Sequence, residues 1–115
     1  MSSDSLNSIS PIDGRYHLKT KELQNYFSEA SLIRYRIKVE IEYFISLCEL
    51  PLEELKEFEI SKFEKLRSYY KDFNIEDAKK VKDFEAITNH DVKAVEYFIK
   101  ERMEADGFGS EKEFV

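Results

Sequence analysis

The chain contains very few of the residues that staple or interrupt a fold. Its 115 residues include one cysteine, two prolines, three glycines and no tryptophan. The single cysteine, Cys48, cannot form a disulfide within the chain, so a reducing compartment is the simpler assumption. The prolines, Pro11 and Pro51, both lie where helices are not expected. Because breakers are so scarce from residue 20 onward, the sequence predicts an all-α fold.

The sequence also lacks an excess of positive charge and any long apolar run. Acidic side chains outnumber basic ones by 24 to 18, giving a net charge of -6, which repels nucleic acid and anionic membranes. No window approaches the roughly 20 apolar residues of a membrane span, and the first dozen residues do not resemble a secretory signal. We therefore expect a cytoplasmic protein with no nucleic-acid or membrane partner.

Ligand sets for metals and motifs for cofactors are missing as well. Two histidines and one cysteine are too few for a zinc site that takes four nitrogen or sulfur ligands from the protein. There is no glycine-rich phosphate loop, no GxGxxG and no serine or cysteine nucleophile motif. We expect no metal and no cofactor.

Apolar spacing and capping residues predict five helices, over residues 20–27, 29–50, 62–71, 75–88 and 90–105. Ser28 is the expected N-cap of the second helix. Ser61 with Glu64, and Asn74 with Asp77, have the spacing of capping boxes that open the third and fourth.

The predicted helix over residues 29–50 carries the most apolar side chains. One face follows helical spacing and consists of Ile33, Ile37, Ile41, Phe44 and Cys48. A second apolar stripe lies beside it and consists of Leu32, Tyr35, Val39 and Leu47. We therefore expect this helix to be central and buried on more than one side.

The expected helices divide the chain into three parts. Residues 1–19 have no apolar periodicity and predict an extended arm with a turn at Pro11 to Gly14. Residues 20–105 form the helical domain, with apolar faces at Ala78, Val81, Phe84 and Ile87 and then at Val92, Val95, Phe98, Ile99 and Met103. Residues 106–115 are expected to be a loop that leads into a further domain.

Two short motifs could carry chemistry. In the first, running from Ser10 to His17, a tight turn places the guanidinium of Arg15 beside the phenol of Tyr16. An arginine fork with an adjacent hydroxyl is a small clamp for phosphate or carboxylate. The alternative is a surface salt bridge with a packed ring, and spacing alone does not decide between them.

The second motif is a polar cluster, Thr88 to Glu96, at the start of an amphipathic helix. Such starts favour anions, and a histidine such as His90 can exchange protons near neutrality or act as a positioning donor. The alternative is structural: Asn89 and Asp91 cap the helix and His90 is a spectator. Runs of Glu and Lys elsewhere are typical of solvated helix faces.

These two motifs, in this order and about seventy residues apart, resemble the adenylosuccinate lyase family. The stretch from Phe27 to Val39, with Arg34 and Arg36, is similar to the first long helix of that family. The resemblance implies the helical N-terminal domain of the fumarase and aspartase type of lyase fold, in a homotetramer. It also implies β-elimination of fumarate from adenylosuccinate, giving AMP, and from the succinyl-carboxamide ribotide of purine biosynthesis, on the route to IMP.

Carried over residue by residue, the resemblance implies that Arg15 and Tyr16 hold the substrate phosphate. It implies that Asn89, His90 and Asp91 contact the nucleotide and the succinyl group. The family takes its general acid and base from later segments that this sequence does not contain, so no catalytic residue is expected here, with His90 at most an auxiliary. The resemblance therefore predicts an inactive segment of a lyase, and the alternative is a free-standing helical module that binds a protein.

Overall fold

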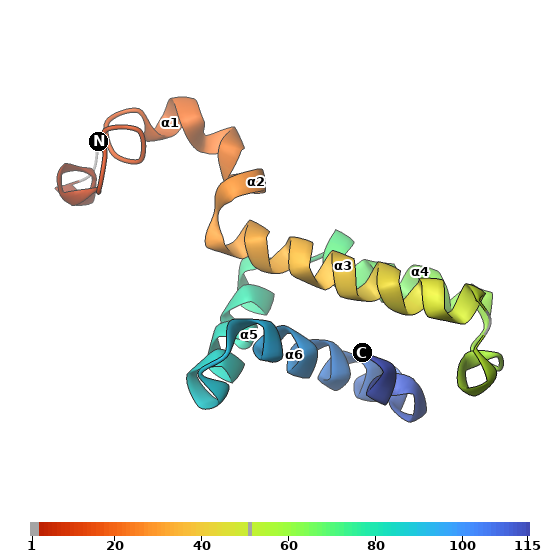
Figure 1. The fold of residues 1–115 in the computed structure, drawn as a ribbon. Coiled ribbons are helices and arrows are strands. Elements are labelled where there is room, and N and C mark those ends of the chain that lie inside the picture. Colours follow the sequence, from red (N-terminus) through yellow and green to blue (C-terminus); the bar gives the residue numbers. More distant parts are fainter. Residues whose placement is uncertain (1–2, 51) are drawn as a thin grey trace. The chain divides into compact units, whose positions relative to one another are not determined.

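The computed structural model describes residues 3–50 and 52–115, and every regular element in them is helical. The α-helices are α1 (His17–Thr20), α2 (Gln24–Phe27), α3 (Glu29–Glu49), α4 (Phe63–Lys71), α5 (Ile75–Thr88) and α6 (Asp91–Ala105) (Figure 1). The all-α prediction is confirmed. The chain divides into two compact units, one ending at Leu32 and the other covering Ile33–Val115.

The first unit is a series of turns and short helices. A 3-10 helix at Ser3–Asn7 is followed by turns, then by α1, a 3-10 helix at Lys21–Leu23 and α2. The expected turn at Pro11 to Gly14 is present, but the preceding residues form 3-10 and turn structure where extended backbone was expected. The single helix expected over residues 20–27 is interrupted at Lys21–Leu23, because no apolar face there is buried to hold a continuous α-helix together.

Helix α3 begins as predicted. The Ser28 hydroxyl oxygen accepts a hydrogen bond from the Ser31 N–H at 3.1 Å, which is N-cap geometry. All five members of the predicted first face are buried. The second stripe is half-buried or exposed, so the expectation of burial on more than one side is wrong. Within the second unit α3 packs along one face only.

Helix α4 does not begin with the predicted capping box. Ser61 lies in a 3-10 helix, Ile60–Lys62, and its hydroxyl donates to the Glu59 carboxylate at 3.2 Å. The backbone already becomes helical at Ile60, after the extended residue Glu59, so Ser61 lies inside a turn of helix and does not occupy an N-cap position. Helix α4 starts at Phe63 and buries four side chains, Phe63, Leu66, Tyr69 and Tyr70.

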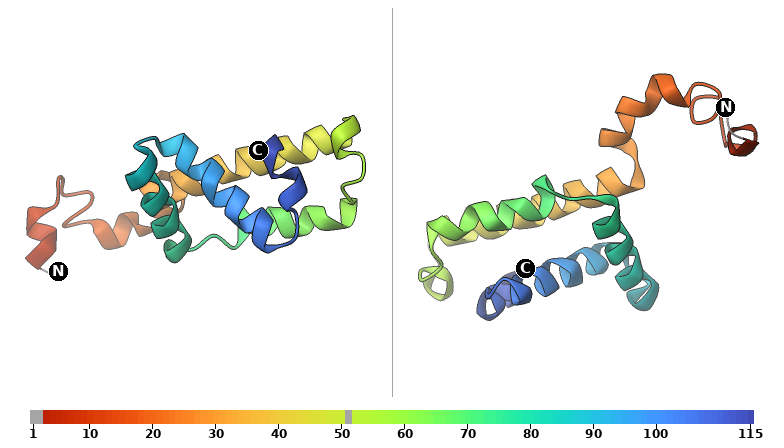
Figure 2. Two further views of the ribbon diagram at one scale, coloured as in Figure 1. Left: turned by 90° about the horizontal axis from the view of Figure 1, so that it is seen from below. Right: turned by 180° about the vertical axis from the view of Figure 1, so that it is seen from behind.

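Helices α5 and α6 are consecutive and pack against each other, crossing at a steep angle in the right-hand view of Figure 2. The predicted capping box of α5 is confirmed, because the Asp77 N–H donates to the Asn74 side chain at 2.9 Å and the Asp77 carboxylate accepts from the Asn74 N–H at 3.2 Å. Ala78 and Val81 are buried, but Ile87 is 81% exposed. On α6 the predicted face is buried except for Val92, which is exposed.

The core of the second unit is aromatic at one end. Phe58 packs edge-on against Phe44 at 5.3 Å and against Phe108 at 5.4 Å between ring centroids. After Phe108 comes a 3-10 helix, Gly109–Phe114, and Phe114 and Val115 pack partly buried on the core. The predicted loop over residues 106–115 is therefore a packed turn of this unit.

A polar network joins α3 to α4 and gives a pH-dependent prediction. The Glu42 carboxylate accepts from Arg67 at 2.9 Å and from the buried hydroxyl of Tyr70 at 2.6 Å. The hydrogen bond from Arg67, and then that from Tyr70, hold the pKa of Glu42 below its usual value. A lowered folded-state pKa stabilises the fold above the unfolded pKa, and this stabilisation is lost as pH falls through the folded pKa.

We expect Glu42→Gln to lower the free energy of unfolding by about 0.5–1 kcal/mol at pH 7, a small value because the carboxylate is partly solvated. The difference from the parent should shrink once pH falls below the ordinary carboxyl range near 4. Urea denaturation of both chains at pH 7 and pH 3.5 measures it. An equal difference at both pH values would contradict the assignment.

Candidate functional site

The first motif is built on a tight turn held by backbone hydrogen bonds. The N–H of Gly14 donates to the Ser10 carbonyl at 2.9 Å, and that of Tyr16 donates to the Pro11 carbonyl at 2.8 Å. The Ser10 hydroxyl accepts from the Ile12 N–H at 3.0 Å, which closes the start of the turn. The sequence Ser-Pro-Ile-Asp-Gly thus fixes the backbone that carries Arg15.

Gly14 is required by a close approach within this turn. A Cβ atom at Gly14 would lie 2.5 Å from the Ser5 carbonyl oxygen and 3.0 Å from the Ser8 Cβ. Because the nearest atom is backbone, it cannot move aside as a flexible side chain would. Any other residue at position 14 must therefore displace the turn that precedes Arg15.

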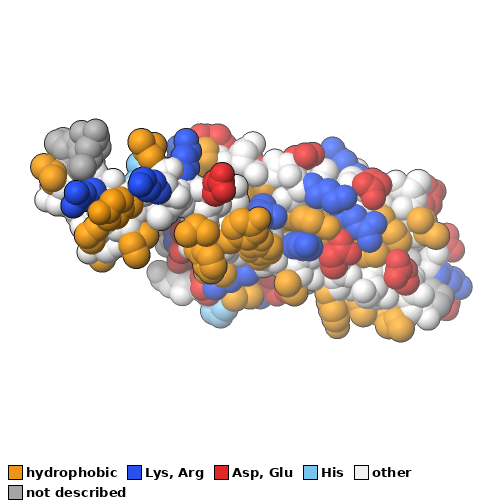
Figure 3. Space-filling model, turned by 90° about the horizontal axis from the view of Figure 1, so that it is seen from above, with side chains coloured by type: hydrophobic (Ala, Val, Ile, Leu, Met, Phe, Trp, Pro, Cys, Tyr) orange, Lys and Arg blue, Asp and Glu red, His pale blue; other side chains and the backbone are white. Residues whose placement is uncertain are grey.

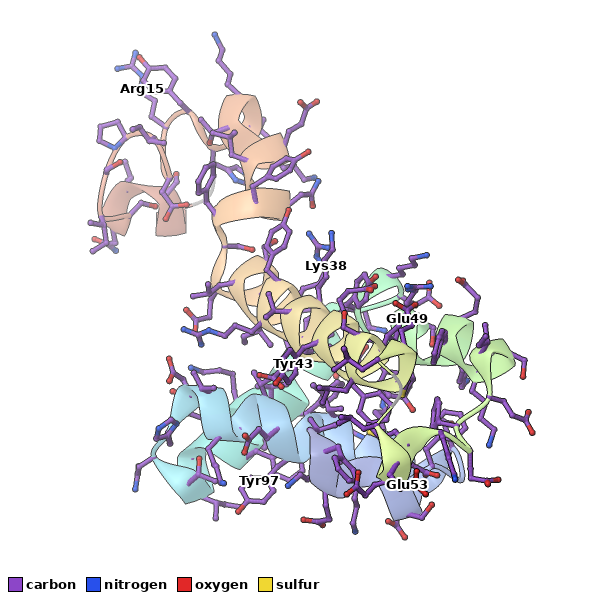
Figure 4. All side chains as sticks on the ribbon, turned by 45° about the vertical axis from the view of Figure 1, so that its right-hand side comes forward. Arg15, Lys38, Tyr43, Glu49, Glu53 and Tyr97 are labelled. Atoms are coloured by element: carbon purple, nitrogen blue, oxygen red, sulfur yellow. The ribbon has the colours of Figure 1, made fainter. Side chains whose placement is uncertain are left out.

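Arg15 and Tyr16 lie side by side as the sequence predicts. Both are exposed, and the Arg15 guanidinium carbon is 5.3 Å from the centroid of the Tyr16 ring (Figure 4 labels Arg15). When the flat face of a guanidinium lies on an aromatic ring, the N–H donors at the edge of the guanidinium remain available. The pair can therefore stack and still offer a planar fork to a phosphate or carboxylate.

The second motif begins where α5 ends. Asn89 has φ of 54° and is the one non-glycine residue with positive φ in the described part of the chain. Its N–H donates to the Glu85 carbonyl at 2.7 Å, so it closes the last turn of α5 in the left-handed conformation. Asparagine tolerates this conformation better than most residues do. Asn89 thus has a structural role at the end of α5. The structural interpretation of the sequence had instead predicted that it caps the start of α6.

His90 is the N-cap of α6. Its Nδ1 accepts a hydrogen bond from the Lys93 N–H at 3.1 Å. Thr88 fixes the backbone of His90 from both sides, since its Oγ1 accepts from the His90 N–H at 3.2 Å and donates to the His90 carbonyl at 3.1 Å. The capping roles suggested for Asn89 and Asp91 therefore fall to His90, which is no spectator.

This capping bond determines which tautomer of His90 is present. A ring nitrogen that accepts a hydrogen bond carries no proton, so in the neutral imidazole the proton sits on Nε2. The side chain is exposed. Nε2 of His90 can therefore donate one hydrogen bond to a ligand. In this tautomer Nε2 already carries a proton and cannot take a second one.

Asp91 is held from two sides. Its Oδ1 accepts from the Val92 N–H at 2.8 Å, and its Oδ2 lies 3.0 Å from Nη1 of Arg36 on α3. The hydrogen bond from Val92, followed by the charge of Arg36, lowers the pKa of Asp91. Asp91 is therefore a carboxylate whose two oxygens both have partners within the chain.

Three backbone donors at the start of α6 are also taken. The N–H groups of Val92, Lys93 and Ala94 donate to Asp91, to His90 Nδ1 and to the His90 carbonyl respectively. A helix start binds anions through such N–H groups when they are free. These three N–H groups are therefore not available to a ligand, which leaves His90 as a side-chain donor at this end of α6.

A shallow hollow lies beside this helix start, between α3 and α6. It has a volume of about 220 Å³ and is lined by Tyr35, Arg36, Val39, Glu40, Val92 and Val95. Burial, and then the nearby carboxylate of Glu96, raise the pKa of Glu40. Ligand pockets usually have roughly 300–1,000 Å³. The hollow is thus large enough for part of a small molecule only.

The predicted site residues fall into two groups in different units. Arg15 and Tyr16 belong to the first unit, and Asn89, His90 and Asp91 belong to the second. The sequence interpretation missed Arg36, which holds Asp91. One feature of the sequence could have indicated its role: Arg36 is a charged residue between the apolar positions Tyr35 and Ile37 of a helix that was expected to be central.

The part of the chain that the structure describes holds neither a metal-binding cluster nor a membrane-spanning helix. It contains no cluster of three or more histidine, cysteine, aspartate or glutamate side chains that could hold a metal ion. None of its helices combines the length and the apolar character needed to cross a membrane.

No family model matches the chain. Three curated proteins that it resembles are all named adenylosuccinate lyase. They come from Dictyostelium discoideum, at 50% identity, from Legionella pneumophila strain Corby, at 46%, and from Escherichia coli K12, at 39%. Each match covers 90% of this chain but only 22–23% of the relative, so the chain spans a little over a fifth of the length of these relatives.

Proposed function

The chain is a homologue of adenylosuccinate lyases over nine-tenths of its length, and from this we propose that it is the N-terminal helical segment of such an enzyme. The whole enzyme would release fumarate from adenylosuccinate, and from the succinyl-carboxamide ribotide, by β-elimination in purine biosynthesis. We propose further that it works in the cytoplasm as a homotetramer of the fumarase and aspartase type.

The observation that carries this proposal is the extent of the similarity. A match over 90% of 115 residues leaves about 11 residues outside it. Arg15 with Tyr16, and Asn89 with His90 and Asp91, therefore lie inside the matched region wherever its ends fall. The similarity covers both motifs together with α3 to α6, whereas an interaction module would need only the apolar faces.

Within this proposal the exposed fork of Arg15, with Tyr16, binds the phosphate of the substrate. A charge-assisted, bidentate contact suits a phosphate because the fork matches two of its oxygens. Asn89 and His90 contact the rest of the nucleotide, His90 by donating through Nε2. Asp91 belongs to the site through its place beside His90.

The elimination needs a base for the proton next to a carboxylate and an acid for the leaving nitrogen. His90 is poorly suited to the role of base, because Nδ1 is engaged and Nε2 already carries a proton. Among the proposed site residues none has the arrangement of an acid and base pair. We propose that both groups come from the remainder of the enzyme and that this segment alone is inactive.

The test is fumarate release from adenylosuccinate by the full-length protein that carries this segment, beside the 115-residue chain at the same molar concentration. The proposal expects turnover by the full-length protein and none by the chain. Turnover by a clean preparation of the chain would mean that the acid and base lie within it. An inactive full-length protein would favour a binding module.

One observation favours the alternative of an interaction module, namely a row of exposed apolar side chains along α3 and at Leu50, the residue that follows it. Val39, Tyr43 and Leu50 are each at least 60% exposed, and apolar groups interspersed with basic ones are visible on the face in Figure 3. Exposed apolar rows mark surfaces that pack against protein. Under the proposed function they pack against the rest of the enzyme.

Asn89 allows its structural and ligand-binding roles to be separated. Asn89→Gly keeps the left-handed backbone and removes only the amide, whereas Asn89→Ala also strains the backbone. We expect both variants of the full-length protein to lower kcat/KM about tenfold, because both lose the amide. Only the alanine variant should lose stability, by about 1 kcal/mol. Full activity in Asn89→Gly would leave Asn89 with a backbone role alone.

A further inference from the structure

Arg36 has so far been given no role toward a ligand, although its ion pair joins α3 to the second motif. Its Nη1 lies 3.0 Å from Oδ2 of Asp91, and the two side chains are 30% and 51% exposed. Arg36 also lines the hollow between α3 and α6, with Val39 and Val92. The contact thus joins the start of α6 to α3 at the edge of this hollow.

The charges around this point need to be compensated if an anion is to bind there. Adenylosuccinate carries a phosphate and two carboxylates, while Asp91 and Glu40 place carboxylates at and near the hollow. Lys93, on the same turn as Asp91, is already paired with Glu96 at 3.2 Å. Arg36 is therefore the cation that faces Asp91 directly.

We propose that Arg36 is a positioning residue of the substrate site, which neutralises Asp91 and holds the His90 turn against α3 so that an anionic substrate can approach. This inference rests on the proposed function. Without Arg36 the carboxylate of Asp91 would keep its bond from Val92 but would present an uncompensated negative charge beside the ligand. Repulsion between like charges a few ångströms apart weakens binding more than it changes the chemistry of a bound substrate.

The first test is steady-state kinetics of the full-length enzyme with Arg36→Gln. We expect KM for adenylosuccinate to rise about five- to thirtyfold while kcat stays within about threefold. The rise should shrink at high salt, because added ions screen the exposed carboxylate. Arg36→Lys should restore most of the loss, since a single ammonium can pair with Asp91.

Arg34→Gln is the matched control. It removes the same charge from the same helix, two residues away, where the guanidinium lies 4.3 Å from the centroid of the Tyr35 ring. We expect its KM to stay within about twofold of the parent. An equal rise in both variants would mean that net charge alone is responsible, and would overturn the assignment of Arg36.

A double-mutant cycle with Asp91→Asn separates positioning through Asp91 from direct contact with the substrate. If Arg36 acts through Asp91, Arg36→Gln raises KM by less than about twofold in the Asp91→Asn background. An undiminished rise in that background would show that Arg36 acts independently of Asp91, and would overturn the proposal. An inactive parent enzyme would instead contradict the proposed function, so the two failures are distinguishable.

Discussion

If the proposed function holds, replacing Arg15 by methionine in the full-length protein should lower kcat/KM for adenylosuccinate about 100- to 1,000-fold. Two charge-assisted hydrogen bonds to one phosphate, each contributing about 1.5–2 kcal/mol, are lost together, and each 1.4 kcal/mol corresponds to a factor of ten. The side chain is exposed in the first unit, so its removal takes away no buried contact. The loss should therefore appear in substrate binding and turnover without a change in unfolding midpoint.

Two variants control for this interpretation. Lys19→Met removes an exposed positive charge from the same unit and should leave kcat/KM within about twofold. Gly14→Ala keeps the guanidinium but displaces the turn below it, because the added Cβ would meet the Ser5 carbonyl. It should therefore lose much of the activity that Arg15→Met loses. If Arg15→Met keeps kcat/KM within threefold of the parent, the phosphate clamp is wrong.

Phe44→Ala should reduce the free energy of unfolding of the 115-residue chain by about 3–5 kcal/mol, the cost of removing a large ring from a packed core. Phe44 is fully buried on α3 and packs edge-on against Phe58, which in turn contacts Phe108. The cavity would open where α3 meets the segment before α4, which contains Phe58, and the segment after α6, which contains Phe108. Because domains have only about 5–15 kcal/mol in total, the variant should be partly unfolded in mild urea.

Tyr43→Ala is the matched control, since it truncates the neighbouring aromatic side chain on the same helix. Tyr43 is 60% exposed, and we expect a loss below about 1 kcal/mol. Phe44→Leu, which keeps most of the volume, should cost about 1–1.5 kcal/mol and remain measurable if the alanine variant does not fold. Equal losses for Tyr43→Ala and Phe44→Ala would contradict the assignment of the buried face of α3.

Helical periodicity predicted the fold well where side chains are buried. The face of α3 from Ile33 to Cys48 is buried throughout, and the ends of α5 and α6 fall at Thr88 and Ala105 as expected. The prediction failed at residues 20–27, where apolar residues without a partner surface do not sustain one helix. It failed again at Ser61, because the chain enters a 3-10 helix at Ile60 and Ser61 therefore does not occupy the N-cap position of α4.

The site could be predicted in composition but not in detail. The two motifs predicted which residues belong to the site, and the residue types from Pro11 to Gly14 predicted the turn. The capping role of His90 was not predictable, because a run of Asn, His and Asp offers three capping side chains and only the backbone decides among them. The pairing of Arg36 with Asp91 joins positions 55 residues apart, which no local pattern reveals.

Our proposal makes this chain one segment of a lyase whose acid and base lie elsewhere in the enzyme. The most direct measurement is fumarate release from adenylosuccinate by the full-length protein, by the 115-residue chain, and by the full-length protein with Arg15→Met. The claim predicts turnover by the first, none by the second and a loss of at least a hundredfold in kcat/KM for the third. Turnover by the chain alone, or an inactive full-length protein, would contradict it.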